Sequence, residues 1–307
     1  MWNQLQSAFR GTGKALAAHR QALRNGPTLA SAMQVLNQRL PPPAEDDLEE
    51  PIFLLSAGWR SGSTLMQRLI MSDRRVLMWG EPYDECGLIQ AMASSMRAFR
   101  PAWPPAEYFY DGTPPHQLSG EWIANLFPSL ADWRLGQRAL FDTQFALPAR
   151  RAGAARWGIK EVRLTGEHAL YLRWLYPRAR FVFLYRDPLE AYRSYCRYGR
   201  DWYDVFPDRP VFTPTAFGHH WRVLMESFEQ QAQPLGALTV RYEDLVSGKL
   251  PLEVLESHLG IAIDRSLLGS KVGSSERGGE KAAVSRLERW LLARASAPLA
   301  QRYGYKW

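Results

Sequence analysis

The chain has 307 residues, 46% of them hydrophobic and 22% charged, with a formal net charge of +7. Its length and its 12 Trp, 13 Tyr and 13 Phe exclude disordered and fibrous proteins, because such a chain can bury a large core. No stretch approaches the ~18 apolar residues of a membrane span, the first residues lack the pattern of a secretory signal, and two cysteines cannot form a disulfide framework. We therefore expect a cytoplasmic protein.

The first 50 residues have the composition of an extension. Residues 1–40 show apolar positions at helical spacing and carry five Lys or Arg but no carboxylate. Three prolines at 41–43 and the acidic run 45–50 are typical of a linker. We predict an N-terminal helical extension over 1–50 and a main domain over 51–307. An ordinary docked helix is favoured over one that lies on an anionic membrane or covers a site.

In the main domain, short apolar runs alternate with helical segments. The candidate strands are Ile52–Leu55, Val76–Trp79, Trp157–Lys160, Arg180–Tyr185 and Leu238–Tyr242. Helices are expected over Thr64–Met71 and Leu189–Tyr198, each after a strand and a turn. This alternation predicts an α/β domain with a mainly parallel central sheet flanked by helices. The Pro- and Trp-rich segment Arg100–Leu130 is expected to be an insertion or a substrate-side segment outside the sheet.

The loop from Gly58 to Thr64 has the character of an anion site. It joins a buried strand to a helix, and a helix N-terminus offers unpaired N–H groups and a favourable dipole to an anion. Its glycines allow a tight turn, and Arg60 adds a permanent charge. It is not a Walker A loop, because three residues rather than four separate its glycines and Ser63 stands where the lysine belongs. A plain strand–turn–helix joint is the alternative.

A second anion site is predicted where the strand ending at Tyr185 meets the next helix. Arg186 lies at the end of the strand, and Asp187 with Glu190 predicts a capping box. Ser194 and Arg197 are three residues apart and share one helical face. Two such motifs suit a ligand that carries phosphates at two separated positions.

These motifs resemble those of sulfotransferases. Arg60–Leu65 is similar to the family's 5′-phosphosulfate loop, and Tyr185–Pro188 with Ser194 is similar to its 3′-phosphate motif. Tyr242–Leu245 and the closing Tyr303–Tyr305 resemble later segments of many members. The resemblance implies a P-loop-like sulfotransferase fold. It also implies in-line transfer of a sulfuryl group from 3′-phosphoadenosine 5′-phosphosulfate (PAPS) to a hydroxyl acceptor, with the bisphosphate PAP as product and no metal.

The resemblance also implies the residues of the nucleotide site. These are Arg60, Ser61, Gly62, Ser63 and Thr64 at the 5′ end, Arg186 and Ser194 at the 3′-phosphate, Tyr242 near the adenine, and Ser275 and Lys281. Tyr242 has the alternative of a packed strand-end tyrosine. Ser275 and Lys281 lie in a Gly-rich loop placed like the family's C-terminal nucleotide loop but without its Arg-Lys-Gly run. Trp59 stands where the family usually has proline or a small residue.

The catalytic residues implied by the resemblance are Glu81, Lys160 and Arg60. Glu81 is similar to the catalytic glutamate of tyrosylprotein sulfotransferases and several bacterial sugar and lipid sulfotransferases, and it would act as the general base. Lys160 resembles a lysine that stabilises the transition state. The alternatives are a turn carboxylate paired with Arg74 or Arg75, and a surface lysine. Rival bases are His116, His219 and His220.

Two other functions stay open: a P-loop-type kinase of small molecules and a non-catalytic nucleotide-binding scaffold. The acceptor is equally open among a sugar, a lipid, a tyrosyl peptide and a phenol. Nucleic acid is not expected as a partner, because the chain has no zinc-finger spacing, RNA-recognition signature or long basic run. Peripheral membrane contact and the oligomeric state are left open.

Overall fold

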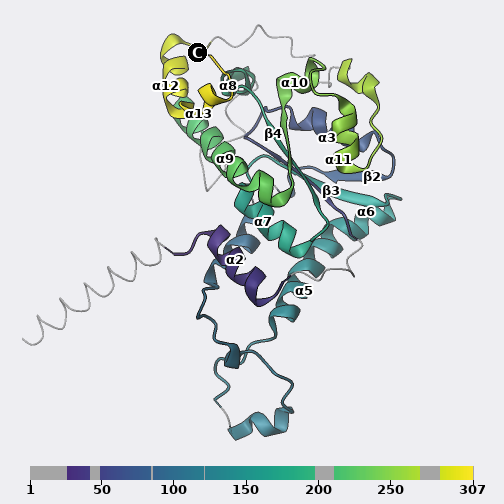
Figure 1. Cartoon of the computed structure of the whole chain (residues 1–307), viewed down its shortest axis with the longest axis vertical. Helices are drawn as coiled ribbons and strands as arrows, with labels where there is room; N and C mark the ends of the chain where they lie inside the picture. The colour runs from purple at the N-terminus through teal and green to yellow at the C-terminus, as the bar shows by residue number, and fades with distance from the viewer. Residues whose placement is uncertain are drawn as a thin grey trace, which may run out of the picture.

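The computed structural model describes residues 26–41, 49–83, 86–120, 122–197, 211–269 and 284–306. Five parallel strands form one sheet in the order β2-β3-β1-β4-β5 (Figure 1). The strands are β1 (Ile52–Ser56), β2 (Val76–Trp79), β3 (Arg156–Glu161), β4 (Arg180–Tyr185) and β5 (Leu238–Arg241). All five coincide with candidate strands from the sequence, so the predicted α/β architecture with a parallel sheet is confirmed.

The central strand β1 is buried along its whole length, because β3 and β4 flank it and helices cover both faces. Its register aligns Ile52 with Gly158 of β3 and with Arg180 of β4. A Cβ on Gly158 would overlap the side chain of Met78 in β2, so only glycine allows these strands to pack at this point.

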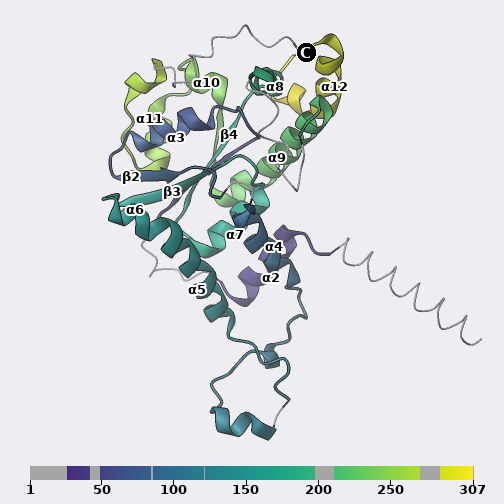
Figure 2. The same ribbon diagram turned by 180° about the vertical axis from the view of Figure 1, so that it is seen from behind.

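Helices lie on both faces of the sheet (Figures 1 and 2). The larger core cluster joins one face to α2 (Leu29–Arg39), α4 (Leu88–Ser95), α5 (Leu130–Phe141), the π-helical turn Asp142–Ala146, α6 (Leu147–Arg151), α7 (Gly166–Leu175), α9 (Pro214–Leu235) and α13 (Leu299–Arg302). The opposite face packs on α3 (Ser63–Met71), α10 (Tyr242–Val246) and α11 (Leu252–Leu259). Two further helices, α8 (Pro188–Arg197) and α12 (Arg286–Ser296), pack with α9 beyond the sheet. The predicted helices after β1 and β4 are therefore present as α3 and α8.

Helix α2 packs against the main domain. Its buried side chains, Leu29, Ala32, Met33 and Leu36, recur at helical spacing, and the three larger ones join the larger core cluster. Thr28 caps the helix by accepting from Ser31 N–H at 3.1 Å. This part of the N-terminal extension is thus a docked helix, whereas residues 1–25 lie outside the described part.

The segment Arg100–Leu130 projects away from the sheet as a separate lobe (Figures 1 and 2). It contains the short 3-10 helices Ala106–Tyr108 and Pro115–Gly120, and an isolated bridge joins Phe109 to Phe127. Its position outside the sheet agrees with the prediction. Within the described residues, no helix is both long and apolar enough to cross a membrane.

Candidate active site

The implied site residues come together because all strands are parallel. The carboxyl ends of parallel strands meet at one edge of a sheet, where ligands of α/β proteins bind. At this edge β1 leads into the loop at Gly58, β2 into Glu81 and β4 into Arg186, and Lys160 lies at the end of β3. Segments more than a hundred residues apart in sequence thus become neighbours.

The loop after β1 turns sharply into α3. Gly58, Arg60 and Gly62 all have positive φ angles, of +87°, +61° and +90°. Gly62 is the N-cap of α3, and a Cβ there would overlap the ring of Tyr242. Gly62 has no side chain with which to cap the helix, so it does not occupy the first N–H groups of α3. An anion at these groups stays a prediction.

Arg60 and Arg186 connect the two predicted phosphate motifs. Arg60 Nε donates to Ser194 Oγ at 3.0 Å, and Arg186 Nη1 donates to the carbonyl oxygen of Arg60 at 3.1 Å. The guanidinium of Arg186 also lies 4.6 Å from the ring centroid of Tyr242. The buried Nε of Arg186 has no hydrogen-bond partner among the described residues. A cationic donor in this state suits an anionic ligand.

The helix after Arg186 begins as predicted, but half of the predicted capping box is wrong. Asp187 Oδ1 accepts from Leu189 N–H at 2.7 Å and so caps α8. Glu190 pairs with Arg193 on the helix surface instead of returning to the Asp187 N–H. That N–H donates to Glu243 Oε1 of α10 at 2.9 Å. Burial raises the pKa of Asp187, and the charge of Glu243 adds to the rise.

Glu243 is a site-supporting residue to which the sequence analysis gave no role. Besides the Asp187 N–H, it accepts from Tyr305 Oη at 3.1 Å and from Arg241 Nε at 3.3 Å. It thereby ties the strand–helix turn at Asp187 to the C-terminal segment. The only sequence signal was its place in the Tyr-Glu-Asp-Leu segment, together with the closing Tyr303–Tyr305.

Glu81 and Lys160 form an ion pair between Nζ and Oε1. The Lys160 side chain is 8% exposed and that of Glu81 is 21% exposed. Both alternatives from the sequence are therefore wrong: Lys160 is not a surface lysine, and Arg75 pairs with Asp73 rather than with Glu81. The reason is topological, because β2 and β3 are neighbours and their carboxyl ends bring the two side chains together.

A second ion pair, Glu161 with Arg163, lies directly beside the first and is almost completely buried. We call it the sealed pair. Arg163 donates to both carboxylate oxygens of Glu161, at 2.7 and 2.6 Å, and the Val162 N–H donates at 2.8 Å. Burial raises the pKa of Glu161, the hydrogen bonds from Arg163 oppose the rise, and the negative charge of Glu81 adds to it. The sequence analysis did not find this pair, although two opposite charges at i and i+2 at a strand end would have been a signal.

The three rival histidines lie in different places. His220 is buried on α9 and stacks on Trp59, with ring centroids 5.0 Å apart. Its ring also packs against Gly58, so it lies directly beside the predicted anion-binding loop Gly58–Thr64, called the phosphate loop below. His219 is exposed beside Arg222, and His116 is exposed in the lobe. Trp59 joins an apolar cluster with residues of α8 and α9, which gives this unusual loop residue a packing role.

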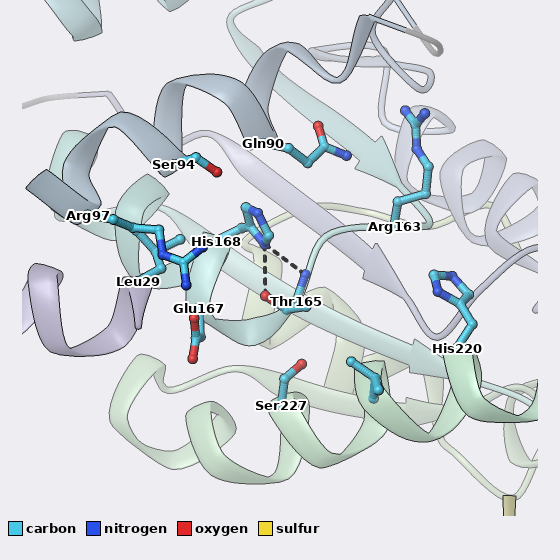
Figure 3. Close-up of a pocket in the computed structure, with 11 residues that line it drawn as sticks. Leu29, Gln90, Ser94, Arg97, Arg163, Thr165, Glu167, His168, His220 and Ser227 are labelled. Carbon is cyan, nitrogen blue, oxygen red and sulfur yellow. Dashed lines mark hydrogen bonds between the residues drawn. The ribbon is translucent and has the colours of Figure 1, made fainter. Parts of the chain in front are cut away.

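A cavity of about 570 Å³ opens between α2, α4, α7 and α9 (Figure 3). Arg163 and His220 lie at one end of it, and Arg97 and Glu167 lie toward the other (Figure 3). It therefore adjoins both the sealed ion pair and the phosphate loop.

Ser275 and Lys281 fall outside the described residues. Within those residues, no three His, Cys, Asp or Glu side chains cluster as metal ligands.

Residues 51–264, more than half of the chain, match the sulfotransferase family. The chain belongs to this family, and the enzyme class that follows is a sulfotransferase. No curated protein matches the sequence.

Solved structures of sulfotransferases are similar to this chain at low sequence identity. The sulfotransferase domain of the Synechococcus PCC 7002 olefin synthase is 15% identical, with a TM-score of 0.43 over 86% of this chain and 98% of that one. The sulfotransferase domain from the curacin biosynthetic pathway is 15% identical, with a TM-score of 0.47 over 85% and 99%. A sulfotransferase from Mycobacterium avium is 16% identical, with a TM-score of 0.43 over 89% and 80%.

Proposed function

We propose that this sulfotransferase uses PAPS as donor and a hydroxyl group as acceptor, with Glu81 as general base. The observation that carries the proposal is the Glu81–Lys160 pair, which lies at the sheet edge where the phosphate loop and Arg186 also converge. A carboxylate at this edge is placed to receive a proton beside the predicted anion site.

The predicted nucleotide site would take a ligand with two separated phosphate groups. The N-terminus of α3 with Arg60 would hold one group, and Arg186 with Ser194 would hold the other. The Arg186 Nε, buried and without a partner among the described residues, supports this assignment. Bound PAPS supplies the sulfuryl group. Contacts from Ser275 and Lys281 stay a prediction.

The protein's own residues would hold charges and move one proton. Glu81 would take the proton of the acceptor hydroxyl onto its carboxylate as the oxygen attacks. Lys160 holds that carboxylate in position, and its buried positive charge would stabilise negative charge that develops at the site. Arg60 would act on the same charge from the phosphate loop.

The first test is a thermal-shift series with PAP, AMP, ADP and ATP, followed by transfer from radiolabelled PAPS. A ligand at 100 times its Kd stabilises the fold by about 2.7 kcal/mol, which is a measurable shift. We expect PAP to raise the Tm more than the other three, and Arg186→Ala to reduce that shift. Stabilisation by ATP but not by PAP would contradict the donor assignment and favour a kinase.

A further inference from the structure

The cavity beside the phosphate loop has a near end and a far end. The near end adjoins the loop between β1 and α3 through His220. His220 packs against Gly58 of the phosphate loop, and Arg163 is held by Glu161, whose chain neighbour is Lys160. The far end, at Arg97 and Glu167, is separated from His220 along the length of the cavity (Figure 3). A molecule in this cavity therefore has one end beside Gly58, in the loop that joins β1 to α3.

Most residues that line the cavity have polar side chains, although about half of the lining surface is apolar. Of the 11 lining residues, only Leu29 and Val223 are apolar, and none is Phe, Tyr or Trp (Figure 3). The polar groups include an amide from Gln90, hydroxyls such as that of Ser94, and the carboxylate of Glu167. Donors and acceptors are thus distributed along the whole length.

The charges of the lining are balanced. Arg163 is neutralised by Glu161, and the far end holds Arg97 and Glu167, one of each sign. Such a lining does not select an anionic acceptor. An apolar ring or alkyl chain could cover the apolar part of the wall but would give no partner to Gln90, Ser94 and Glu167, whereas a sugar presents both C–H faces and hydroxyls.

We infer that the cavity binds a polyhydroxylated acceptor, that is, a sugar or an oligosaccharide. This inference rests on the proposed function. The hydroxyl that reacts lies at the His220–Arg163 end, and the other hydroxyls of the acceptor bond to Gln90, Ser94 and Glu167. The volume of about 570 Å³ is that of a small-ligand site. Sites built to hydrogen-bond a substrate reject analogues that lack those groups, so phenols and alkyl alcohols are poor acceptors.

The test is saturation-transfer NMR in the presence of PAP, with maltose, p-nitrophenol, 1-octanol and a tyrosine-containing peptide as probes. Gln90→Leu removes an amide from the middle of the cavity at similar volume. Gln230→Leu is the matched control, since Gln230 is exposed on α9 and outside the cavity. Glu167→Gln is a second variant at the far end, which keeps the test valid if Gln90→Leu does not fold.

We expect saturation transfer to maltose, weakened roughly tenfold in affinity by Gln90→Leu, weakened by Glu167→Gln and unchanged by Gln230→Leu. Binding of p-nitrophenol, octanol or the peptide without maltose would overturn the inference, and so would maltose binding that neither cavity variant weakens. The PAP thermal shift separates the two proposals. Loss of that shift contradicts the proposed function, whereas a normal shift without sugar binding contradicts only the acceptor class.

Discussion

Two acid–base pairs lie side by side at the end of β3, and they differ in exposure. The side chains of Lys160 and Glu81 are 8% and 21% exposed, whereas those of Arg163 and Glu161 are both 2% exposed. A carboxylate must reach its substrate to exchange a proton. The difference in exposure therefore supports the proposal that Glu81 transfers the proton, and it suits Glu161 to a positioning role, although both are glutamates beside a cation.

Burying the sealed pair is unfavourable because both charges lose their hydration, and removing only one of its partners destabilises the fold even more. Removing two charges from water is unfavourable, and the raised pKa of Glu161 is a consequence of its burial. The two bonds from Arg163 offset this cost, and they also fix Arg163 in the cavity wall. The two pairs should thus respond to mutation in opposite ways, one in activity and the other in stability.

The largest effect is expected for Glu81→Gln. Loss of the base should lower kcat by about 10²–10⁴-fold, the usual contribution of general acid–base catalysis. The PAP thermal shift should remain, because Glu81 is not placed in the nucleotide site. Glu253→Gln is the control, since it removes a carboxylate from an exposed ion pair with Arg265. Turnover at the normal rate in Glu81→Gln would exclude this residue as the base and turn attention to His220.

For Glu161→Gln we expect the main loss in stability rather than in kcat. Neutralising Glu161 leaves the buried Arg163 charge without its carboxylate, which lowers the free energy of unfolding by about 3–5 kcal/mol. Urea denaturation measures this loss. The double variant Glu161→Leu with Arg163→Met should recover much of it, because neither charge then remains buried. If the single variant were as stable as the wild type, the pair would have no structural role.

The two pairs also show which features of the fold and the site can be predicted from the sequence. The strands were predictable because a parallel sheet buried on both faces needs continuous apolar runs, as in Ile52–Leu55. The phosphate loop was predictable because a strand, two glycines and a helix start are adjacent in sequence. The contact of Glu81 with Lys160 joins residues 79 positions apart. Family resemblance suggested both residues, but only the order of the strands in the sheet shows that they touch.

Local rules also failed where a distant partner competed. The capping-box pattern placed Glu190 opposite the Asp187 N–H, but Glu243 of α10 occupies that position instead. Glu190 is exposed enough to pair with Arg193 three residues on, and nothing within the helix itself favours one arrangement over the other. The cavity could not be predicted from the sequence either, because its lining residues come from four separate helices and their ends.

A third prediction concerns the loop rather than the pairs. Gly62→Ala should destabilise the fold by about 1–3 kcal/mol, because φ is +90° there and the new Cβ would overlap Tyr242. Displacement of Tyr242 should also weaken PAP binding, through its contact with Arg186. Gly136→Ala on α5 is the control. It has open space around it, and it should stabilise the helix. Unchanged PAP affinity in Gly62→Ala would mean that this packing does not shape the nucleotide site.

The smallest effect is expected at a third pair, Asp73 with Arg75, which precedes β2 at the opposite edge of the sheet. Hydrogen bonds from Arg75 and from the Ala262 N–H lower the pKa of Asp73 below its ordinary value of 3.8. A carboxylate with a lowered pKa stabilises the fold above the unfolded pKa, and this contribution is lost as the pH falls through the folded value.

Asp73→Asn should therefore lower the free energy of unfolding by about 1 kcal/mol at pH 7, and the difference from the wild type should shrink as the pH falls below about 4. Urea denaturation across this range measures the effect. Transfer activity at pH 7 should be unchanged, because the pair lies at the edge away from Glu81 and Lys160. A difference that persisted undiminished at low pH would show that Asp73 stabilises the fold through its shape and hydrogen bonds rather than through its charge. A loss of activity would show that the two edges of the sheet are coupled, and exposure alone would then no longer suffice to assign roles to the three pairs.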